Sequence, residues 1–157
     1  MLKTDTLLAT MRRRPQPVEY ARRQGETIEV PPQTTGVFVQ QCSDCVVVCP
    51  EKVTQIALST STGMTLRFVS VISSLEVLRC ADVAIEFSGT CNTIVVEASN
   101  HLLVMLPSDS SVQIVSMASE NLRLRNQGVE YTVPNVATQT VTHWNGCEFT
   151  SQPLQRM

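Results

Sequence analysis

The sequence predicts an all-β protein, a parallel β-helix of about five to six coils that ends in a β-hairpin. Apolar residues alternate two apart along many short stretches, as they do on the buried face of a strand. These stretches recur about every 19 residues between residues 36 and 125, and a fixed period of this size is typical of a solenoid. Leucine-rich repeats have a similar period, but their Leu-x-Leu-x-x-Asn pattern does not occur in this sequence. A β-sandwich, the alternative fold, gives no reason for a constant period.

The first strand of each repeat is expected to form one wall of the helix. Its alternating stretches begin at residues 37, 56, 75, 94 and 114, in steps of 19, 19, 19 and 20. Equivalent residues of stacked strands lie about 4.8 Å apart, so the inward ones should form a ladder of Val37, Ile56, Leu75, Ile94 and Ile114. The outward row is unusually apolar for a surface, which makes it a candidate interface; it contains Phe38, Ala57, Glu76, Val95 and Val115.

A second strand follows about ten residues later in each repeat and is expected to form the opposite wall. We expect its inward ladder to be Val48, Phe68, Phe87, Leu106 and Leu124. The outward row would then mix apolar and charged residues, namely Val47, Arg67, Glu86, Met105 and Arg123. Gly63, Gly89 and Gly128 fall at or near corners, where a positive φ is useful.

Both ends of a solenoid expose strand edges that need a cover. We expect residues 15–35, with Pro31-Pro32, to cover the first coil. Near the other end, Asn145-Gly146 lies between two alternating runs, which predicts a hairpin with a type I′ turn. Trp144 and Phe149 make this hairpin apolar enough to cap its own coil or to dock on another chain by strand addition.

Length and charge restrict the class of protein. A chain of 157 residues suits one domain, and a net charge of −2 does not suit a nucleic-acid binder. No apolar run reaches the length of a transmembrane helix, so we expect no stable membrane insertion and a cytoplasmic protein. Residues 1–25 carry a charge of +4 and the remainder −6. This basic head is interpreted as a partly disordered leader or as an arm that binds an acidic protein surface or a membrane. We assign residues 1–15 to a flexible leader and residues 16–157 to the β-helix domain.

The sequence offers no convincing metal or catalytic site. Cys42 and Cys45 have the spacing of a zinc or redox pair, but no second pair or nearby histidine completes a set of four ligands. We therefore expect reduced thiols, no metal and no cofactor. No Ser-His-Asp order, phosphate loop or carboxylate cluster emerges, so we expect no enzyme activity. His143, beside Trp144, is interpreted as structural.

Six segments in a fixed order carry a resemblance to a known family. They are VEYARRQGETIEV (18–30), VFVQQC (37–42), EKVTQIALS (51–59), IVSMASENL (114–122), EYTVPN (130–135) and THWNG (142–146). Their order and spacing resemble the C-terminal actin-binding domain of cyclase-associated proteins, which is built from CARP repeats. The resemblance covers roughly residues 16–150, and its most specific part is the ending in Trp-Asn-Gly.

The resemblance implies a right-handed β-helix that binds monomeric actin in the cytoplasm, associates with the cytoskeleton, prefers ADP-actin and promotes exchange of ADP for ATP. Lys52 corresponds to a basic residue linked with actin contact in the family, and it joins Phe38, Ala57, Glu76 and Val95 as an actin-binding candidate. The resemblance also implies a homodimer in which the C-terminal hairpin, about residues 129–150, is exchanged. The dimerisation candidates are Val141, His143, Trp144, Asn145, Gly146 and Phe149.

Some features depart from the family. Where the family often has Phe-Asp-Asp, this chain has Phe68-Val69-Ser70, so it lacks the acidic pair through which such a contact with actin would be made. The family's helical modules, proline-rich runs and Wiskott-homology motif are not visible in the sequence, which suggests a compact form or a fragment. Two alternatives stay open. One is a module that sequesters actin without speeding exchange. The other is a GTPase-regulating domain like that of tubulin cofactor C, whose Gln-x-Arg-x-His signature is approached only by residues 120–125.

Overall fold

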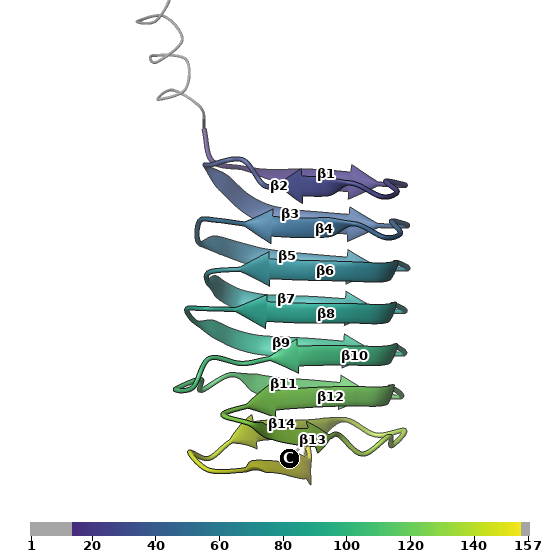
Figure 1. The fold of residues 1–157 in the computed structure, drawn as a ribbon, viewed down its shortest axis with the longest axis vertical. Coiled ribbons are helices and arrows are strands. Elements are labelled where there is room, and N and C mark those ends of the chain that lie inside the picture. The colour runs from purple at the N-terminus through teal and green to yellow at the C-terminus, as the bar shows by residue number, and fades with distance from the viewer. Residues whose placement is uncertain (1–13, 155–157) are drawn as a thin grey trace, which may run out of the picture.

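Each repeat folds into one coil of two strands, and six coils stack along a common axis (Figure 1). The structure is a computed structural model that describes residues 14–154. The first strand of each coil belongs to the first wall: β1 (Gln16–Ala21), β3 (Thr34–Gln40), β5 (Val53–Ser59), β7 (Val71–Leu78), β9 (Cys91–Glu97) and β11 (Gln113–Met117). The second strand belongs to the second wall: β2 (Thr27–Glu29), β4 (Val46–Cys49), β6 (Thr62–Phe68), β8 (Ala81–Phe87), β10 (Asn100–Met105) and β12 (Glu120–Asn126). Neighbouring coils pair in parallel in both walls, which confirms the predicted parallel β-helix.

The first wall has the register that the sequence predicts. Val37 pairs with Ile56, and the pairing continues through Leu75 and Ile94 to Ile114. All five side chains are fully buried. Like side chains therefore stack from coil to coil and exclude water from the interior along the whole wall.

In the second wall, the predicted inward ladder is displaced by one residue at Val48 and by two residues at Leu124. Its central inward ladder is Val47, Leu66, Ile85, Val104 and Leu124, in steps of 19, 19, 19 and 20. Val48 points outward, in the row of Arg67, and the ladder of Phe68 and Phe87 begins instead at Cys49. The two phenyl rings of that ladder stack with centroids 5.0 Å apart. The corrected outward row is Val48, Arg67, Glu86, Met105 and Arg125.

The first corner, which leads from a first-wall strand to the second-wall strand of the same coil, uses left-handed backbone at two fixed positions. One position has φ between 48° and 59° at Arg22, Gln41, Thr60, Arg79, Ala98 and Ala118. The other, three residues later, has φ between 53° and 67° at Gly25, Asp44, Gly63, Asp82, His101 and Asn121. Left-handed backbone costs about 1 kcal/mol or more for a residue other than glycine. All six coils have this conformation at the same two positions. The geometry of the corner therefore outweighs the backbone preference of the individual residues.

A ladder of hydroxyl and thiol groups fills the inside of the first corner. It consists of Cys42, Ser61, Cys80, Ser99 and Ser119, all buried. The Ser99 hydroxyl donates to the carbonyl of Glu97 at 3.0 Å and accepts the N–H of Cys80, one coil earlier, at 3.1 Å. Ser61 makes the same two bonds, to Ser59 and from Cys42. The ladder thus satisfies backbone groups that the corner removes from the strand pairing.

The second corner leads from a second-wall strand to the next coil, and its geometry is more variable. Gly89 lies there without a positive φ, although Gly63 and Gly128 have one. A Cβ at Gly89 would collide with the Ser70 hydroxyl and come within 2.6 Å of the Val69 carbonyl oxygen. Close contact between two coils therefore explains this glycine. Pro31 and Pro32 also lie at a second corner, because residues 15–35, expected to cover the first coil, form that coil themselves.

The C-terminal end contains two hairpins rather than one. β13 (Val129–Thr132) pairs with β12 through the two-residue turn Gln127-Gly128, in which both residues have positive φ. β14 (Thr140–Trp144) and β15 (Phe149–Pro153) form the second hairpin, and β14 pairs antiparallel with β11 of the same chain. The type I′ turn expected at Asn145-Gly146 is wrong. Residues 145–148 form a longer turn, in which the Asn145 side chain accepts the N–H groups of Cys147 and Glu148, each at 3.0 Å.

The structure does not describe the two ends of the chain. Residues 1–13 of the expected leader and residues 155–157 are outside the described residues. Within residues 14–154, no helix is long and apolar enough to cross a membrane.

We expect Ser99→Ala to lower the free energy of unfolding by about 1–3 kcal/mol, because the buried Cys80 N–H then loses its acceptor. Ser99→Cys is the matched control, since Cys42 and Cys80 hold equivalent places in the same ladder. Urea unfolding followed by circular dichroism measures both. Equal losses for the two variants would show that the side-chain acceptor at this position contributes little.

Candidate functional site

The outward row of the first wall brings four of the five actin-binding candidates together. Phe38 pairs with Ala57, Ala57 with Glu76, and Glu76 with Val95. The row continues to Glu19 at one end and to Val115 and Val141 at the other. It is therefore one line of side chains that crosses seven strands, about 4.8 Å from one to the next.

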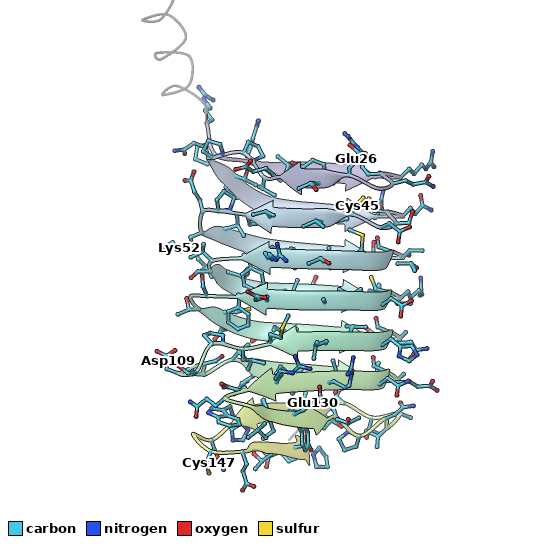
Figure 2. All side chains as sticks on the ribbon, viewed as in Figure 1. Glu26, Cys45, Lys52, Asp109, Glu130 and Cys147 are labelled. Carbon is cyan, nitrogen blue, oxygen red and sulfur yellow. The ribbon has the colours of Figure 1, made fainter. Side chains whose placement is uncertain are left out.

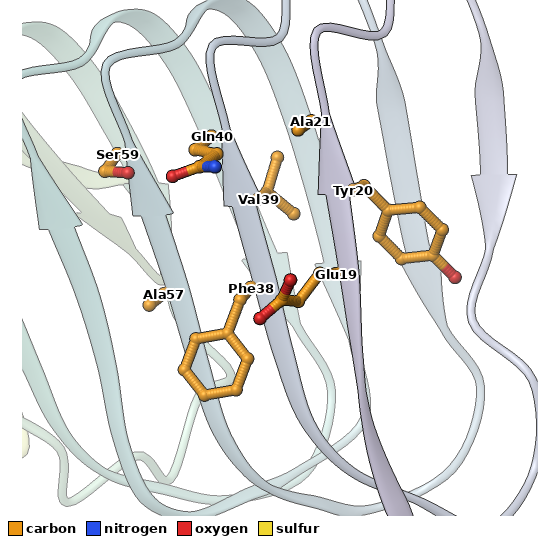
Figure 3. Close-up of a pocket in the computed structure, with 8 residues that line it drawn as sticks. All are labelled: Glu19, Tyr20, Ala21, Phe38, Val39, Gln40, Ala57 and Ser59. Carbon is orange, nitrogen blue, oxygen red and sulfur yellow. The ribbon is translucent and has the colours of Figure 1, made fainter.

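A hollow of about 230 Å³ lies at the N-terminal end of this row, over β1, β3 and β5 (Figure 3). The Phe38 ring covers the backbone at Gly36, where a Cβ would lie 2.9 Å from the ring. Ala57 and Ser59 on the neighbouring strand are small and leave space beside the ring. Glu19 lines the same hollow from β1. The hollow can therefore receive an apolar group next to a carboxylate.

The two walls differ in the sign of their charge. The first wall is extended by β14 and β15 to a sheet of eight strands, which contains three carboxylates, Glu19, Glu76 and Glu97, and no lysine or arginine. The second wall is extended by β13 to a sheet of seven strands, which contains five acidic residues and three arginines. The strands of the first wall thus carry carboxylates and apolar side chains without a cation of their own, while Arg22 and Arg79 lie just beyond β1 and β7 at the first corner. This strand surface favours a partner with apolar and cationic groups.

Lys52, the fifth candidate, does not lie in the row. It is exposed at the second corner between β4 and β5, on the edge of the stack that also carries Asp109 (Figure 2). The next second corner exposes two apolar side chains, Val69 at 40% and Ile72 at 57%. Lys52 and Val69 therefore lie at consecutive second corners, and Ile72 lies at the start of the strand that follows.

Sequence reasoning did not identify Ile72 as exposed. Val71 and Ile72 follow the alternation set by Leu75 and Val77, so Val71 is buried and Ile72 faces outward. An irregularity in the pairing of β7, between Val71 and Ser74, gives this strand one more residue there than β5 and β9. Counting back by twos from Leu75 identifies Ile72 as an outward residue.

Five of the six dimerisation candidates, all except Gly146, make contacts within their own chain in this structure. Trp144 and Phe149 are buried and contact each other edge to face, with ring centroids 4.9 Å apart. His143 lies 3.3 Å from the Thr150 hydroxyl across the hairpin. Val141 extends the outward row beside Val115. Asn145 and Gly146 belong to the exposed turn. The hairpin therefore covers the last coil of its own chain.

The cysteines show no arrangement for metal binding. All six are free, and only Cys147 is exposed. Cys42 and Cys45 donate to the backbone carbonyls of Gln40 and Ser43 within their own corner. Among the described residues, no group of three or more metal-ligating side chains comes together. Burial raises the pKa of Cys49 to about 12 and that of Cys91 to about 11, so both thiols stay protonated near neutral pH.

The arginines nearest to a GTPase-activating pattern are engaged on the second wall. Glu130 on β13 lies 3.0 Å from Arg125 and 3.6 Å from Arg123. Both arginines are exposed, and both share this single carboxylate. They form a surface charge cluster rather than a free arginine on an open coil.

Two comparisons with known proteins agree with this architecture. The model of the family described as "Adenylate cyclase associated (CAP) C terminal" matches residues 16–156. The crystal structure of the cyclase-associated protein from Cryptosporidium parvum is similar, with a TM-score of 0.68. The match has 20% identity and covers 87% of this chain and 90% of that chain, so it shows the fold alone. No curated protein sequence matches this chain significantly.

We expect one thiol, Cys147, to react rapidly with Ellman's reagent at pH 8 in the folded protein, and the other five only after unfolding. The free energy of unfolding should fall as the pH rises above about 9. The Cys49 and Cys91 thiols ionise near 9 in the unfolded chain but only near 11 to 12 in the folded one. Thiol counting and urea unfolding at pH 7, 9 and 10 measure both effects. Rapid reaction of two or more thiols would contradict the buried placement.

Proposed function

Since the chain belongs to the family of C-terminal domains of adenylate cyclase-associated proteins, we propose that it binds monomeric actin, prefers the ADP form and speeds exchange of ADP for ATP. Released monomers would then return to polymerisation in the cytoplasm, and the chain would bind actin without acting as an enzyme. The observation that carries the proposal is the outward row of the first wall, which offers an apolar and acidic line on a rigid sheet.

The chemistry of the row suits a protein partner. Apolar residues that lie side by side on a surface tend to mark interfaces, and Phe38 beside the hollow provides an aromatic anchor of the kind that dominates binding energy. Glu76 lies in the middle of the row and accepts a hydrogen bond from Gln55 at 3.3 Å. A rigid wall presents these groups with little loss of conformational entropy on binding. Lys52, on the adjacent edge, supplies the only lysine among residues 14–154.

We further propose that two chains form a homodimer by exchanging the β14–β15 hairpin. Residues 134–138, which lead into β14, are exposed and so form a suitable hinge. The contacts of β14 with β11, and of Trp144 beneath the last coil, are identical whether the hairpin comes from the same chain or from a second copy. Exchange of an identical element is therefore a low-cost route to a dimer.

The two alternatives predict different activities. A sequestering module would bind actin and slow exchange or leave it unchanged. A GTPase-regulating domain would need an arginine free to reach a nucleotide, whereas Arg123 and Arg125 both pair with Glu130. The pairing of both arginines is the observation that disfavours the GTPase alternative, whereas an assay of nucleotide exchange on actin distinguishes exchange from sequestration.

We expect Ala57→Arg to reduce the stimulation of nucleotide exchange at least tenfold, because it places a bulky side chain between Phe38 and Glu76, at the hollow. Lys52→Ala should reduce it about twofold to fivefold, as expected for one exposed ionic contact. Release of fluorescent ADP from monomeric actin in the presence of excess ATP measures the rate for the full chain and each variant.

Ala84→Arg is the matched control, because Ala84 faces outward from β8 on the second wall with exposure similar to that of Ala57. It should leave exchange unchanged. Equal losses for Ala57→Arg and Ala84→Arg would remove the first wall from the proposal. Binding without faster exchange in the unaltered chain would favour sequestration, and stimulated GTP hydrolysis by small GTPases would favour the other alternative.

We expect light scattering after size-exclusion chromatography to give twice the chain mass of 17.3 kDa at micromolar concentration. Tagged and untagged chains should form mixed dimers readily after unfolding and refolding together. Mixing them in the folded state should give mixed dimers slowly, because exchange requires the hairpin to leave its coil. A clean monomer would rule out the dimer, and fast mixing of folded dimers would rule out hairpin exchange.

A further inference from the structure

The acidic first wall and the basic N-terminal residues have complementary chemistry. The strands of that wall contain Glu19, Glu76 and Glu97 without a lysine or arginine, next to the apolar row of Phe38, Ala57 and Val95. Residues 1–13 contain three basic residues against one acidic residue, together with leucine and methionine. Arg14, the next residue, is exposed and also basic. The segment therefore offers both the cationic and the apolar groups that the wall favours.

The attachment point makes contact possible. Residue 14 comes two residues before β1, the strand at the end of the wall, and β1 carries Glu19 at the rim of the hollow. Thirteen residues span at most about 47 Å when extended. The distance across the wall from β1 to Glu97 on β9 is four strand spacings, or about 19 Å. The segment is long enough to reach every carboxylate of the wall.

The second wall is a poorer surface for a basic segment. Arg67, Arg123 and Arg125 face outward there, and Glu130 already pairs with two of them. A cation near this wall meets repulsion and partly neutralised carboxylates. The carboxylates of the first wall have no cationic neighbour on their own strands, so their field remains available.

We propose that residues 1–13 dock on the outward face of the first wall, over the hollow formed by β1, β3 and β5, and compete there with the protein partner. The contact forms within one chain. The basic segment then occupies the surface that the partner binds, and the partner displaces it. The competition depends on the proposed function, because it assumes that the partner uses the same wall, whereas the docking itself does not.

Carbodiimide cross-linking of the full chain tests the docking directly. This reagent joins a lysine amine to a carboxylate in direct contact, with loss of water. The chain has only two lysines, Lys3 and Lys52. We expect peptides that join Lys3 to Glu19, Glu76 or Glu97 in the monomer band of a denaturing gel. Their yield should fall several-fold between 20 mM and 500 mM salt, because screening weakens exposed charge pairs.

Control reactions distinguish docking on the first wall from contact with the second wall and from contact between chains. Glycine amide added with the reagent should label exposed carboxylates of both walls, which shows that both are activated. Links from Lys3 to Glu29, Glu86 or Glu130 of the second wall would overturn the proposal. Links found only between chains, or no Lys3 links although labelling succeeds, would overturn it as well. Ala57→Arg should reduce the first-wall links, and Ala84→Arg should not.

The exchange assay tests the competition separately. Replacing Arg12 and Arg13 by glutamate should raise stimulation by the full chain at subsaturating concentration about twofold to fivefold, since exposed ion pairs are individually weak. A loss of stimulation would instead show that the segment binds the partner, and would overturn the competition. If no chain stimulates exchange, the proposed function fails, while the cross-links still decide the docking.

Discussion

Parallel pairing of equivalent residues between coils is the constraint on which the rest of the structure depends. Because Val37, Ile56 and Leu75 occupy the same place in successive strands, every other position of the coil is also repeated at the strand spacing of about 4.8 Å. The inward ladders, the corner hydroxyl ladder and the outward row are consequences of this one register. A change of one residue in the spacing would turn an entire strand's apolar side chains outward.

The two corners of each coil contribute differently to the constant register. The first corner has a constant length, with left-handed residues at the same two places and a hydrogen-bonded side chain such as Ser61 or Ser99 between them. The second corner absorbs the differences. Val53 pairs with Val71 after 18 residues, and Val71 with Cys91 after 20, while the strand centres keep a spacing of 19. The added residue of the last coil lies between Val104 and Ile114, which also brackets a second corner.

The sequence was sufficient for the fold and the first wall, and insufficient where alternation is hidden. In β4, three valines precede Cys49, and an all-apolar strand gives no sign of which face is inward, so the prediction of Val48 as an inward residue is wrong. The ladder predicted for Leu124 is wrong because the added residue before β11 makes Val104 its partner. The outward row of Phe38, Ala57, Glu76 and Val95 could be predicted because it follows the correct register. Lys52 could not be placed, since it lies in a second corner, where the spacing varies from coil to coil.

The outward faces of the two walls differ in how far their charges are compensated within the wall. On the second wall, Arg123 and Arg125 lie across from Glu130 on the antiparallel strand β13, so much of the charge is compensated within the wall. On the first wall, Glu19, Glu76 and Glu97 each pair with apolar neighbours on the adjacent strands and find no cation on their own sheet. Uncompensated charges of one sign raise the energy of the free surface slightly and favour any cationic segment that covers it. The same register that stacks the core therefore also aligns an acidic and apolar line whose charges are satisfied best by a basic segment.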